Sequence, residues 1–252
     1  MVSLEYLAFE VTRRCNEWCK MCMRGDPEEI DMSEEIVNKV LLNNYIQDIE
    51  TIMFTGGEPT LNEKLICYIV DLVIKNNIPV NRLSMVTNAK KFPKDILEAF
   101  NDYQKYCKYN NMKSKVTINF SVDVFHENYP EVIREYQEKY PQFQYEFKGL
   151  DWIWKTGRAE HGDKFKYRIE PMYVQIIMGY LWVMNTLYVT AKGNYETMGD
   201  GMYTDMDRIH MGSVFDNSLL DILSRYGEIK DDDKQEFKRL LYMAKTSSGH
   251  II

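Results

Sequence analysis

The stretch LEYLAFEVTRRCNEWCKMC, residues 4–22, runs from a strand-like segment directly into three closely spaced cysteines. Residues 4–11 combine β-branched and aromatic residues with alternating polarity, which is typical of a β-strand. Cys15, Cys19 and Cys22 follow, with three residues between the first two and two residues between the next pair. We therefore expect one tight loop after the strand to present three thiolates to a common centre.

The spacing of these cysteines favours an iron–sulfur cluster. Three thiolates can ligate three corners of a cubane and leave the fourth iron open to bind and reduce a small molecule. A structural zinc ion is usually closed by four ligands, and no further His or Cys stands at a suitable spacing nearby. Zinc and three incidental buried cysteines are the alternatives at this point. The two other cysteines, Cys67 and Cys107, stand alone. A cluster of three cysteines within an odd total of five suits a metal site in a reducing compartment better than a set of disulfides.

Strand-like and helix-like segments alternate from the first strand to about Gly149. A helix is expected to begin after an N-cap at Ser33 and to end near Leu42. Further strands are expected at 51–54, 82–87 and 115–122, and further helices at 61–75, 93–107 and 130–140. This alternation predicts a parallel α/β sheet or barrel, whose active site lies at the C-terminal ends of its strands.

A second motif, GGEP, follows the strand-like residues 51–54. Gly56 and Gly57 permit close backbone approach, and Glu58 supplies an acceptor for an ammonium group. Taken alone, such a run is a common turn. Its value comes from its combination with the three cysteines.

Together the two motifs resemble the radical S-adenosylmethionine (SAM) superfamily. Its signature is a cysteine, three residues, a cysteine, two residues and a cysteine in the loop after the first barrel strand. The resemblance implies one [4Fe–4S] cluster on the three cysteines, with SAM bound at the open iron. It also implies that Met21, where the family usually has an aromatic residue, lies beside the adenine. The run Gly56, Gly57, Glu58 and Pro59 would hold the methionine amino group.

The resemblance extends to other strand ends. Asn88, Ser121 and Asp123 follow strands at positions where the family commonly contacts the SAM carboxylate, the ribose or the substrate. His126 lies on the same rim and would orient substrate or exchange a proton, unless it is a solvated ring at a helix start. Arg158 matches a Gly-Arg-Ala run of several members and would bind a carboxylate or phosphate, unless it is an ordinary surface arginine.

The C-terminal part of the chain follows a different pattern. Residues 180–199 predict two strands joined by a turn at 192–194, and a helix from Asp216 and a final amphipathic helix follow. This layout resembles a SPASM or twitch extension, but Thr197, Met198 and Gly199 stand where the auxiliary-cluster cysteines would be. The fold class expected is therefore α/β, with a shortened β/α TIM-like barrel over residues 1–159 and a small β-hairpin and helix subdomain, without an auxiliary cluster, over 160–252.

The resemblance also implies a reaction. Reductive cleavage of SAM would give a 5′-deoxyadenosyl radical, which would remove a hydrogen atom from a peptide or small metabolite. A flavodoxin or ferredoxin-type protein would supply the electron. Without an auxiliary cluster, redox-neutral chemistry is favoured over net oxidation. The alternatives are nucleoside or 7-deazapurine-type radical chemistry and a structural metal-binding adaptor.

Composition narrows the possible partners. The 252 residues include 31 Lys and Arg against 38 Asp and Glu, and the net charge of −7 disfavours a nucleic-acid substrate. The sequence has no signal-peptide pattern and no apolar run of about 20 residues, so we expect a cytoplasmic protein outside the membrane. The first strand begins so early that no N-terminal leader-recognition domain is expected.

Overall fold

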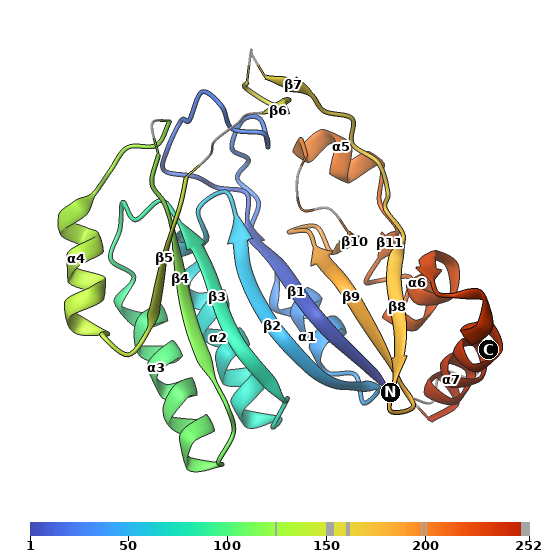
Figure 1. The fold of residues 1–252 in the computed structure, drawn as a ribbon. Helices are drawn as coiled ribbons and strands as arrows, with labels where there is room; N and C mark the ends of the chain where they lie inside the picture. The colour runs from blue at the N-terminus through green and yellow to red at the C-terminus, as the bar shows by residue number, and fades with distance from the viewer. Residues whose placement is uncertain (124, 150–153, 160–161, 198, 200, 248–252) are drawn as a thin grey trace.

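The computed structural model describes residues 1–123, 125–149, 154–159, 162–197, 199 and 201–247, and it is built around one large twisted sheet (Figure 1). Among these residues the sheet has ten strands, eight of them in the order β11-β10-β9-β1-β2-β3-β4-β5. The strands of the first half are β1 (Val2–Thr12), β2 (Ile46–Gly56), β3 (Val80–Thr87), β4 (Lys115–Ser121) and β5 (Gln144–Lys148). All five are parallel to their neighbours.

The helices that connect these strands confirm the predicted alternation. They are α1 (Glu34–Leu41), α2 (Glu63–Lys75), α3 (Lys94–Tyr109) and α4 (Pro130–Lys139), with the short 3-10 helix η1 (Pro59–Asn62) ahead of α2. Ser33 caps α1 as predicted, because its hydroxyl accepts a hydrogen bond from the Ile36 amide. The fold class is therefore α/β with a partial β/α barrel.

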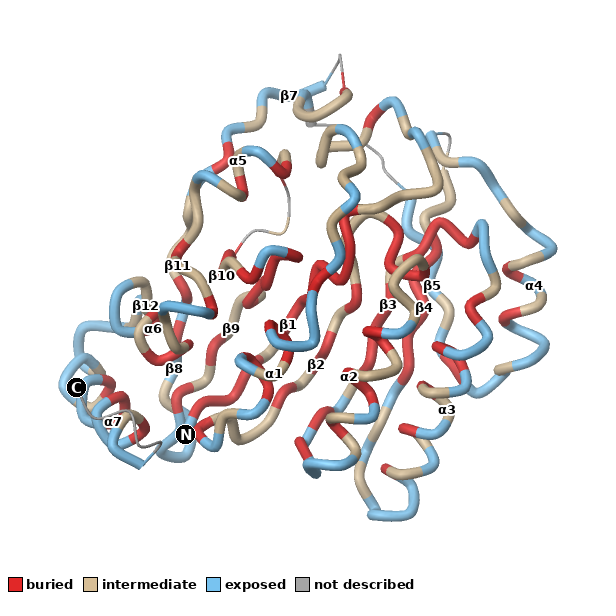
Figure 2. The backbone as a smooth tube through the Cα atoms, turned by 180° about the vertical axis from the view of Figure 1, so that it is seen from behind, coloured by how far each residue is buried: buried red, intermediate tan, exposed pale blue. Residues whose placement is uncertain are grey.

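The core lies between the sheet and the helices that cover its outer face. In the view from behind, buried segments run along β1, β2 and β3 and along the inward sides of α1, α2 and α3 (Figure 2). Strand β1 is central, and almost all of its residues are buried because neighbouring strands flank it on both sides. Its Phe9 pairs with Phe54 of β2 on one side and with Val189 on the other.

The C-terminal half joins the same sheet. Strand β9 (Tyr180–Val189) runs parallel to β1, and a turn at Gly193, with φ of +82°, leads into the antiparallel β10 (Asn194–Glu196), as predicted. The remaining elements are β6 (Trp154–Lys155), β7 (Asp163–Lys164), β8 (Met172–Ile177), α5 (Tyr203–Arg208), β11 (Gly212–Ser213), α6 (Leu219–Tyr226), β12 (Gly227–Glu228), η2 (Asp231–Asp233) and α7 (Lys234–Ser247). Helices α6 and α7 match the two predicted C-terminal helices. The division at residues 159 and 160 stays a prediction.

Strand β5 was not predicted from the sequence. It is a short edge strand beside β4, and four of its five residues are exposed. The sequence QYEFK does alternate polar residues with the aromatic Tyr145 and Phe147, which is the pattern of a strand, but this short run was overlooked. The alternation of strands and helices therefore ends with β5, the strand after α4. Among the described residues, β1 to β5 form a run of five parallel strands in the shortened barrel.

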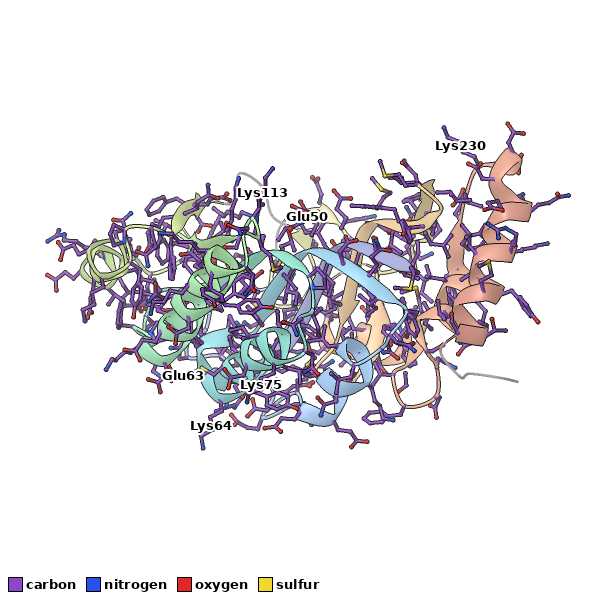
Figure 3. All side chains as sticks on the ribbon, turned by 90° about the horizontal axis from the view of Figure 1, so that it is seen from below. Glu50, Glu63, Lys64, Lys75, Lys113 and Lys230 are labelled. Atoms are coloured by element: carbon purple, nitrogen blue, oxygen red, sulfur yellow. The ribbon has the colours of Figure 1, made fainter. Side chains whose placement is uncertain are left out.

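The two ends of the sheet differ in character. Seen from below, the end near the start of the strands carries side chains of both charges, and those of Glu50, Lys113 and Lys230 extend outward (Figure 3). The opposite end, where β1 to β4 finish, gathers the loops that contain the cysteines and the GGEP run. Among the described residues, no helix combines the length and the apolar character that crossing a bilayer requires.

Candidate functional site

A cavity of about 680 Å³ opens at the C-terminal ends of β1 to β4. All of the residues predicted for the site line this cavity, namely Cys15, Cys19, Met21, Cys22, Gly56, Gly57, Glu58, Pro59, Asn88, Ser121, Asp123, His126 and Arg158. They come from the loops after four parallel strands and from the segment after β6. The structure therefore brings together residues that are far apart in the sequence, and the role of each in binding is a separate question.

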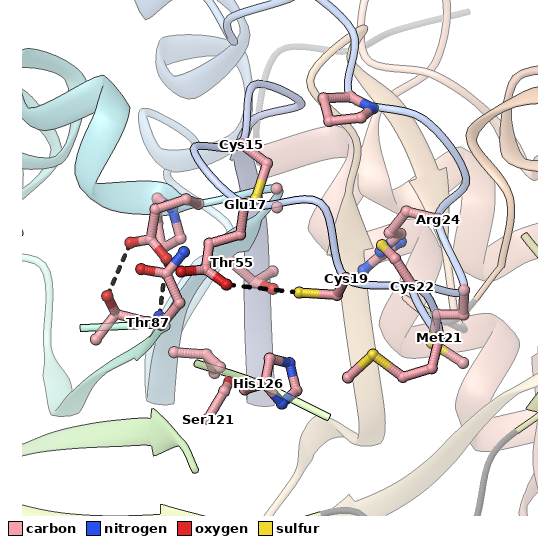
Figure 4. A pocket seen from close by; sticks show the side chains of 18 of the residues that line it. Cys15, Glu17, Cys19, Met21, Cys22, Arg24, Thr55, Thr87, Ser121 and His126 are labelled. Atoms are coloured by element: carbon pink, nitrogen blue, oxygen red, sulfur yellow. Dashed lines mark hydrogen bonds between the residues drawn. The ribbon is translucent and has the colours of Figure 1, made fainter. Parts of the chain in front are cut away.

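The cysteine loop forms one wall of the cavity. The amide of Cys22 donates to the carbonyl of Cys19 at 3.1 Å, which closes a tight turn between the second and third cysteines. All three side chains are free thiols. The Cys19 thiol is directed toward the Glu17 carboxylate, with 3.8 Å between Sγ and Oε2 (Figure 4).

The surroundings of Cys15 and Cys19 disfavour the charged form of their thiols. Burial raises the pKa of Cys19 to about 12, and the neighbouring Glu17 carboxylate adds to the rise, whereas the Arg158 guanidinium opposes it. Burial also raises the pKa of Cys15. A bound cation reverses this balance, because a thiol that coordinates a metal is deprotonated outright. Three thiols on one wall suit a soft metal or an iron–sulfur cluster.

The described residues contain no three His, Cys, Asp or Glu side chains that converge closely enough to hold one metal ion. The ligands of a cubane bind different irons. They do not need to converge in that way, so the donor set fits a cluster held at three corners.

The GGEP run is packed against the cysteine loop. The amide of Gly57 donates to the Thr12 carbonyl at 2.9 Å, and the amide of Glu58 donates to the Arg14 carbonyl at 2.8 Å. A Cβ atom at Gly56 would lie 2.1 Å from the Thr12 carbonyl oxygen, and one at Gly57 would lie 2.2 Å from that of Arg14. The glycines therefore allow two loops to meet, which fixes the GGEP run relative to the cysteines.

Glu58 ties the ends of β2 and β3 together. Its buried carboxylate accepts hydrogen bonds from the hydroxyls of Thr60 at 2.7 Å and Thr87 at 2.8 Å, and from the amide of Asn88 at 2.9 Å. Burial raises the pKa of Glu58, although these hydrogen bonds oppose the rise. The carboxylate also lines the cavity. Its predicted contact with an ammonium group stays a prediction.

Asp123 and His126 form a pair on the side of the cavity opposite the cysteine loop. The imidazole Nδ1 lies 2.8 Å from Asp123 Oδ1, which is the geometry of Nδ1–H donating to a carboxylate. The same oxygen accepts from the backbone amides of Phe125 and His126. The imidazole is thus held in place and is largely buried. Figure 4 shows it beside Ser121 at the cavity wall.

Arg158 lies against the cysteine loop. Its amide donates to the Cys22 carbonyl at 2.9 Å, and its Nε donates to the Cys19 carbonyl at 3.0 Å. The guanidinium carbon is 4.3 Å from the centre of the exposed Trp18 ring. These contacts distinguish Arg158 from an ordinary surface arginine.

The base of the cysteine loop is fixed by a buried charge network. Arg13 has no exposed surface and contacts the carboxylates of Glu10, Glu28 and Asp207 at 2.6, 2.8 and 2.8 Å. Glu10, also fully buried, receives further hydrogen bonds from the Tyr188 hydroxyl and the Ala191 amide. Because a buried arginine is tolerated only with such partners, this network couples the loop to both β9 and α5.

Several cavity residues were not predicted. Glu17 and Arg24 belong to the cysteine loop, and their charge and position beside the cysteines were usable signals. Lys148 is the last residue of β5, a strand that was not predicted. Tyr203, in α5, gave no signal, because only the fold brings its ring to the cavity, where its amide donates to the Arg24 carbonyl at 3.1 Å. Of the auxiliary-cluster positions, Met198 lies outside the described residues.

A family model, one curated protein and one solved structure are similar to this chain. The family model described as the radical SAM superfamily matches residues 9–142, which contain both the cysteine loop and the GGEP run. An uncharacterized protein of Methanocaldococcus jannaschii is 26% identical over 151 residues, which are 58% of this chain and 48% of that protein. The chain thus spans about half the length of this curated relative. A solved structure of native anSMEcpe with bound AdoMet and Cp18Cys peptide has a TM-score of 0.48 and 12% identity, with 95% of this chain and 83% of that chain covered.

Proposed function

This chain belongs to the radical SAM superfamily, and we propose that it cleaves SAM reductively at a single [4Fe–4S] cluster held by Cys15, Cys19 and Cys22. The superfamily uses a [4Fe–4S] cluster and SAM as cofactors. The observation that carries the proposal is the shared cavity wall, on which the three thiols and the GGEP run face the same space. When bound, the two cofactors supply a 5′-deoxyadenosyl radical that removes a hydrogen atom from the substrate.

The residues around the cavity would bind and orient SAM. In this proposal Gly56 to Pro59 receive the methionine amino group, and Met21 packs against the adenine. Asn88, Ser121 and Asp123 contact the SAM carboxylate, the ribose or the substrate. The buried hydrogen bonds of Glu58 support this arrangement, because they hold the strand ends rigid before SAM binds.

The pair of Asp123 and His126 would face the substrate. Asp123 occupies Nδ1 of the imidazole, so Nε2 remains for a substrate group. A substrate that needs a proton added or removed would use this atom. We propose a peptide or a small metabolite as the substrate.

The proposed reductant is a flavodoxin or ferredoxin-type protein, because a cluster that cleaves SAM works toward the low end of the roughly −700 to +450 mV range of iron–sulfur centres. Free thiols at Cys15, Cys19 and Cys22 favour a reducing compartment, and we propose the cytoplasm. The part from residue 160 onward is proposed to be a twitch-like subdomain without an auxiliary cluster, because no cysteine follows Cys107.

Anaerobic reconstitution with iron and sulfide tests this proposal. We expect about four irons per chain, as one cubane requires, and formation of 5′-deoxyadenosine after dithionite and SAM are added. Cys19→Ser is expected to lose both signals. Cys67→Ser is the matched control, because Cys67 lies on α2 and is not among the residues that line the cavity. A Cys19→Ser protein that keeps the full cluster and its cleavage of SAM would exclude the assignment.

A further inference from the structure

Gly157 and Arg158 form a backbone contact with the cysteine loop that only glycine permits. Gly157 has a φ of +61°, and a Cβ atom there would lie 2.3 Å from the Cys22 carbonyl oxygen. The next amide, that of Arg158, donates to the same carbonyl at 2.9 Å. The segment is therefore seated directly on the residue that ends the three-cysteine motif.

The Arg158 side chain adds a second attachment to the loop. Its Nε donates to the Cys19 carbonyl at 3.0 Å, so one residue binds the carbonyls of two cysteines. The guanidinium lies over the Trp18 ring at 4.3 Å, and only 13% of the side chain is exposed. A planar guanidinium can make these contacts together because its donors are fixed in one fork.

One guanidinium nitrogen still lacks a hydrogen bond. Nη1 of Arg158 is buried and has no hydrogen-bond partner among the described residues, although it is 3.5 Å from an Asp26 carboxylate oxygen. Buried donors in proteins are almost always paired. Since Arg158 lines the cavity, an anionic acceptor inside the cavity would complete its hydrogen bonding. Thiolate and sulfide groups of an iron–sulfur cluster are acceptors of this kind.

We propose that Arg158 is a positioning residue for the [4Fe–4S] cluster, which keeps the turn from Cys19 to Cys22 in its ligating shape and raises the cluster's reduction potential. The inference rests on the proposed function, because it presumes a cluster on these cysteines. A positive charge and an N–H donor beside the cluster both favour the reduced state, which carries one more negative charge. Arg158 thus eases the reduction that precedes SAM cleavage.

Two substitutions at Arg158 separate charge from shape. Arg158→Gln removes the charge, so the midpoint potential of the cluster is expected to become more negative. Arg158→Lys keeps the charge but lacks the fork, so its potential is expected to stay closer to that of the unchanged protein. Both variants lose the Nε contact with Cys19 and are expected to release iron faster to a chelator. Gly157→Ala keeps Arg158 but displaces the segment, and it is expected to release iron faster as well.

The experiment uses the full chain after anaerobic reconstitution. The cluster is titrated potentiometrically with its EPR signal as the readout, and iron release to a chelator is followed by absorbance. Arg239→Gln is the matched control, because this arginine lies on α7 and pairs with its neighbour Glu236 on the exposed surface. Its potential and iron release are expected to equal those of the unchanged protein.

The outcomes separate this inference from the proposed function. A more negative potential in Arg158→Gln, partly restored in Arg158→Lys, supports the inference. Faster release of iron from folded Arg158→Gln and Arg158→Lys proteins than from the unchanged protein also supports it. If Arg158→Gln holds four irons at the potential of the unchanged protein, the inference is wrong while the proposed function stands. If the unchanged chain forms no cluster, the proposed function itself fails.

Discussion

Gly57→Ala tests whether the GGEP run is held by its contact with the cysteine loop. The new methyl group would lie 2.2 Å from the Arg14 carbonyl oxygen and 2.9 Å from that of Arg13. Both contacts are with backbone atoms, which cannot rotate away as the end of a side chain can. The two loops must therefore separate, and the hydrogen bonds from Gly57 to Thr12 and from Glu58 to Arg14 are lost.

The expected cost follows from these contacts. Two backbone hydrogen bonds contribute about 1 kcal/mol each, and forcing a methyl group into packed structure costs about 1–3 kcal/mol. The free energy of unfolding should then fall by about 3–5 kcal/mol. In a chain of this size, such a loss lowers the melting temperature by roughly 6–20 °C.

Thermal unfolding of the apoprotein, followed by circular dichroism, measures this loss without interference from the cluster. Gly179→Ala is the control, because Gly179 has a φ of +81° and no atom within 4 Å of the added Cβ. Only backbone strain of about 1–2 kcal/mol is expected there. A Gly57→Ala protein that is as stable as Gly179→Ala would refute the close approach between the two loops.

Three further predictions concern the charges and the SAM contacts. Arg13→Met should reduce the free energy of unfolding by about 3–5 kcal/mol, because it leaves Glu10 buried without its main partner. Chemical denaturation measures this loss. The control is Arg14→Met, at a partly exposed arginine, which should lose at most about 1 kcal/mol. Burial raises the pKa of Glu196 to about 8, although the Tyr167 hydroxyl opposes the rise. The folded state therefore holds this proton more tightly than the unfolded chain, so stability is full below about pH 4.5 and falls as pH rises toward 8. Glu196→Gln should remove that fall, and parallel pH profiles of the two proteins would show the reasoning to be wrong. Ser121→Ala should weaken SAM binding about tenfold, as expected for loss of a hydrogen bond to a charged group, while the iron content of the variant stays unchanged. Calorimetry measures the affinity for SAM. An unchanged affinity would show that Ser121 does not contact SAM.

The sequence predicted most of the first half of the fold, because the signals there are local. Ser33 marks the start of α1, and the apolar spacing within 61–75 identifies α2 without knowledge of the rest. Strand β5 carries a local signal as well, because QYEFK alternates polar and aromatic residues, but the run has only five residues and was overlooked. The parallel pairing of β9 with β1 was not predicted either, because the two strands are far apart in the sequence, as the paired residues Tyr6 and Thr186 show.

The candidate site divides in the same way. The cysteines and the GGEP run are contiguous motifs, so their chemistry could be proposed from residue type and spacing. The contacts that hold them are long-range, as between Arg13 and Asp207, and no pattern in the sequence pairs these residues. The predicted binding of a carboxylate or phosphate by Arg158 stays a prediction, and the structure adds hydrogen bonds from this residue to the carbonyls of Cys19 and Cys22. The positive charge of Arg158 is known from the residue type, whereas its contacts with the cysteine loop could be seen only in the folded structure.

Binding of SAM to the open iron of a three-cysteine cluster is tested by the EPR spectrum of the reduced, reconstituted protein, recorded before and after SAM is added. A cubane on three cysteines has one iron without a protein ligand, and SAM bound at that iron changes its coordination. We predict a [4Fe–4S] signal whose g values shift when SAM is present. A spectrum that SAM leaves unchanged, or the absence of a [4Fe–4S] signal, would contradict it.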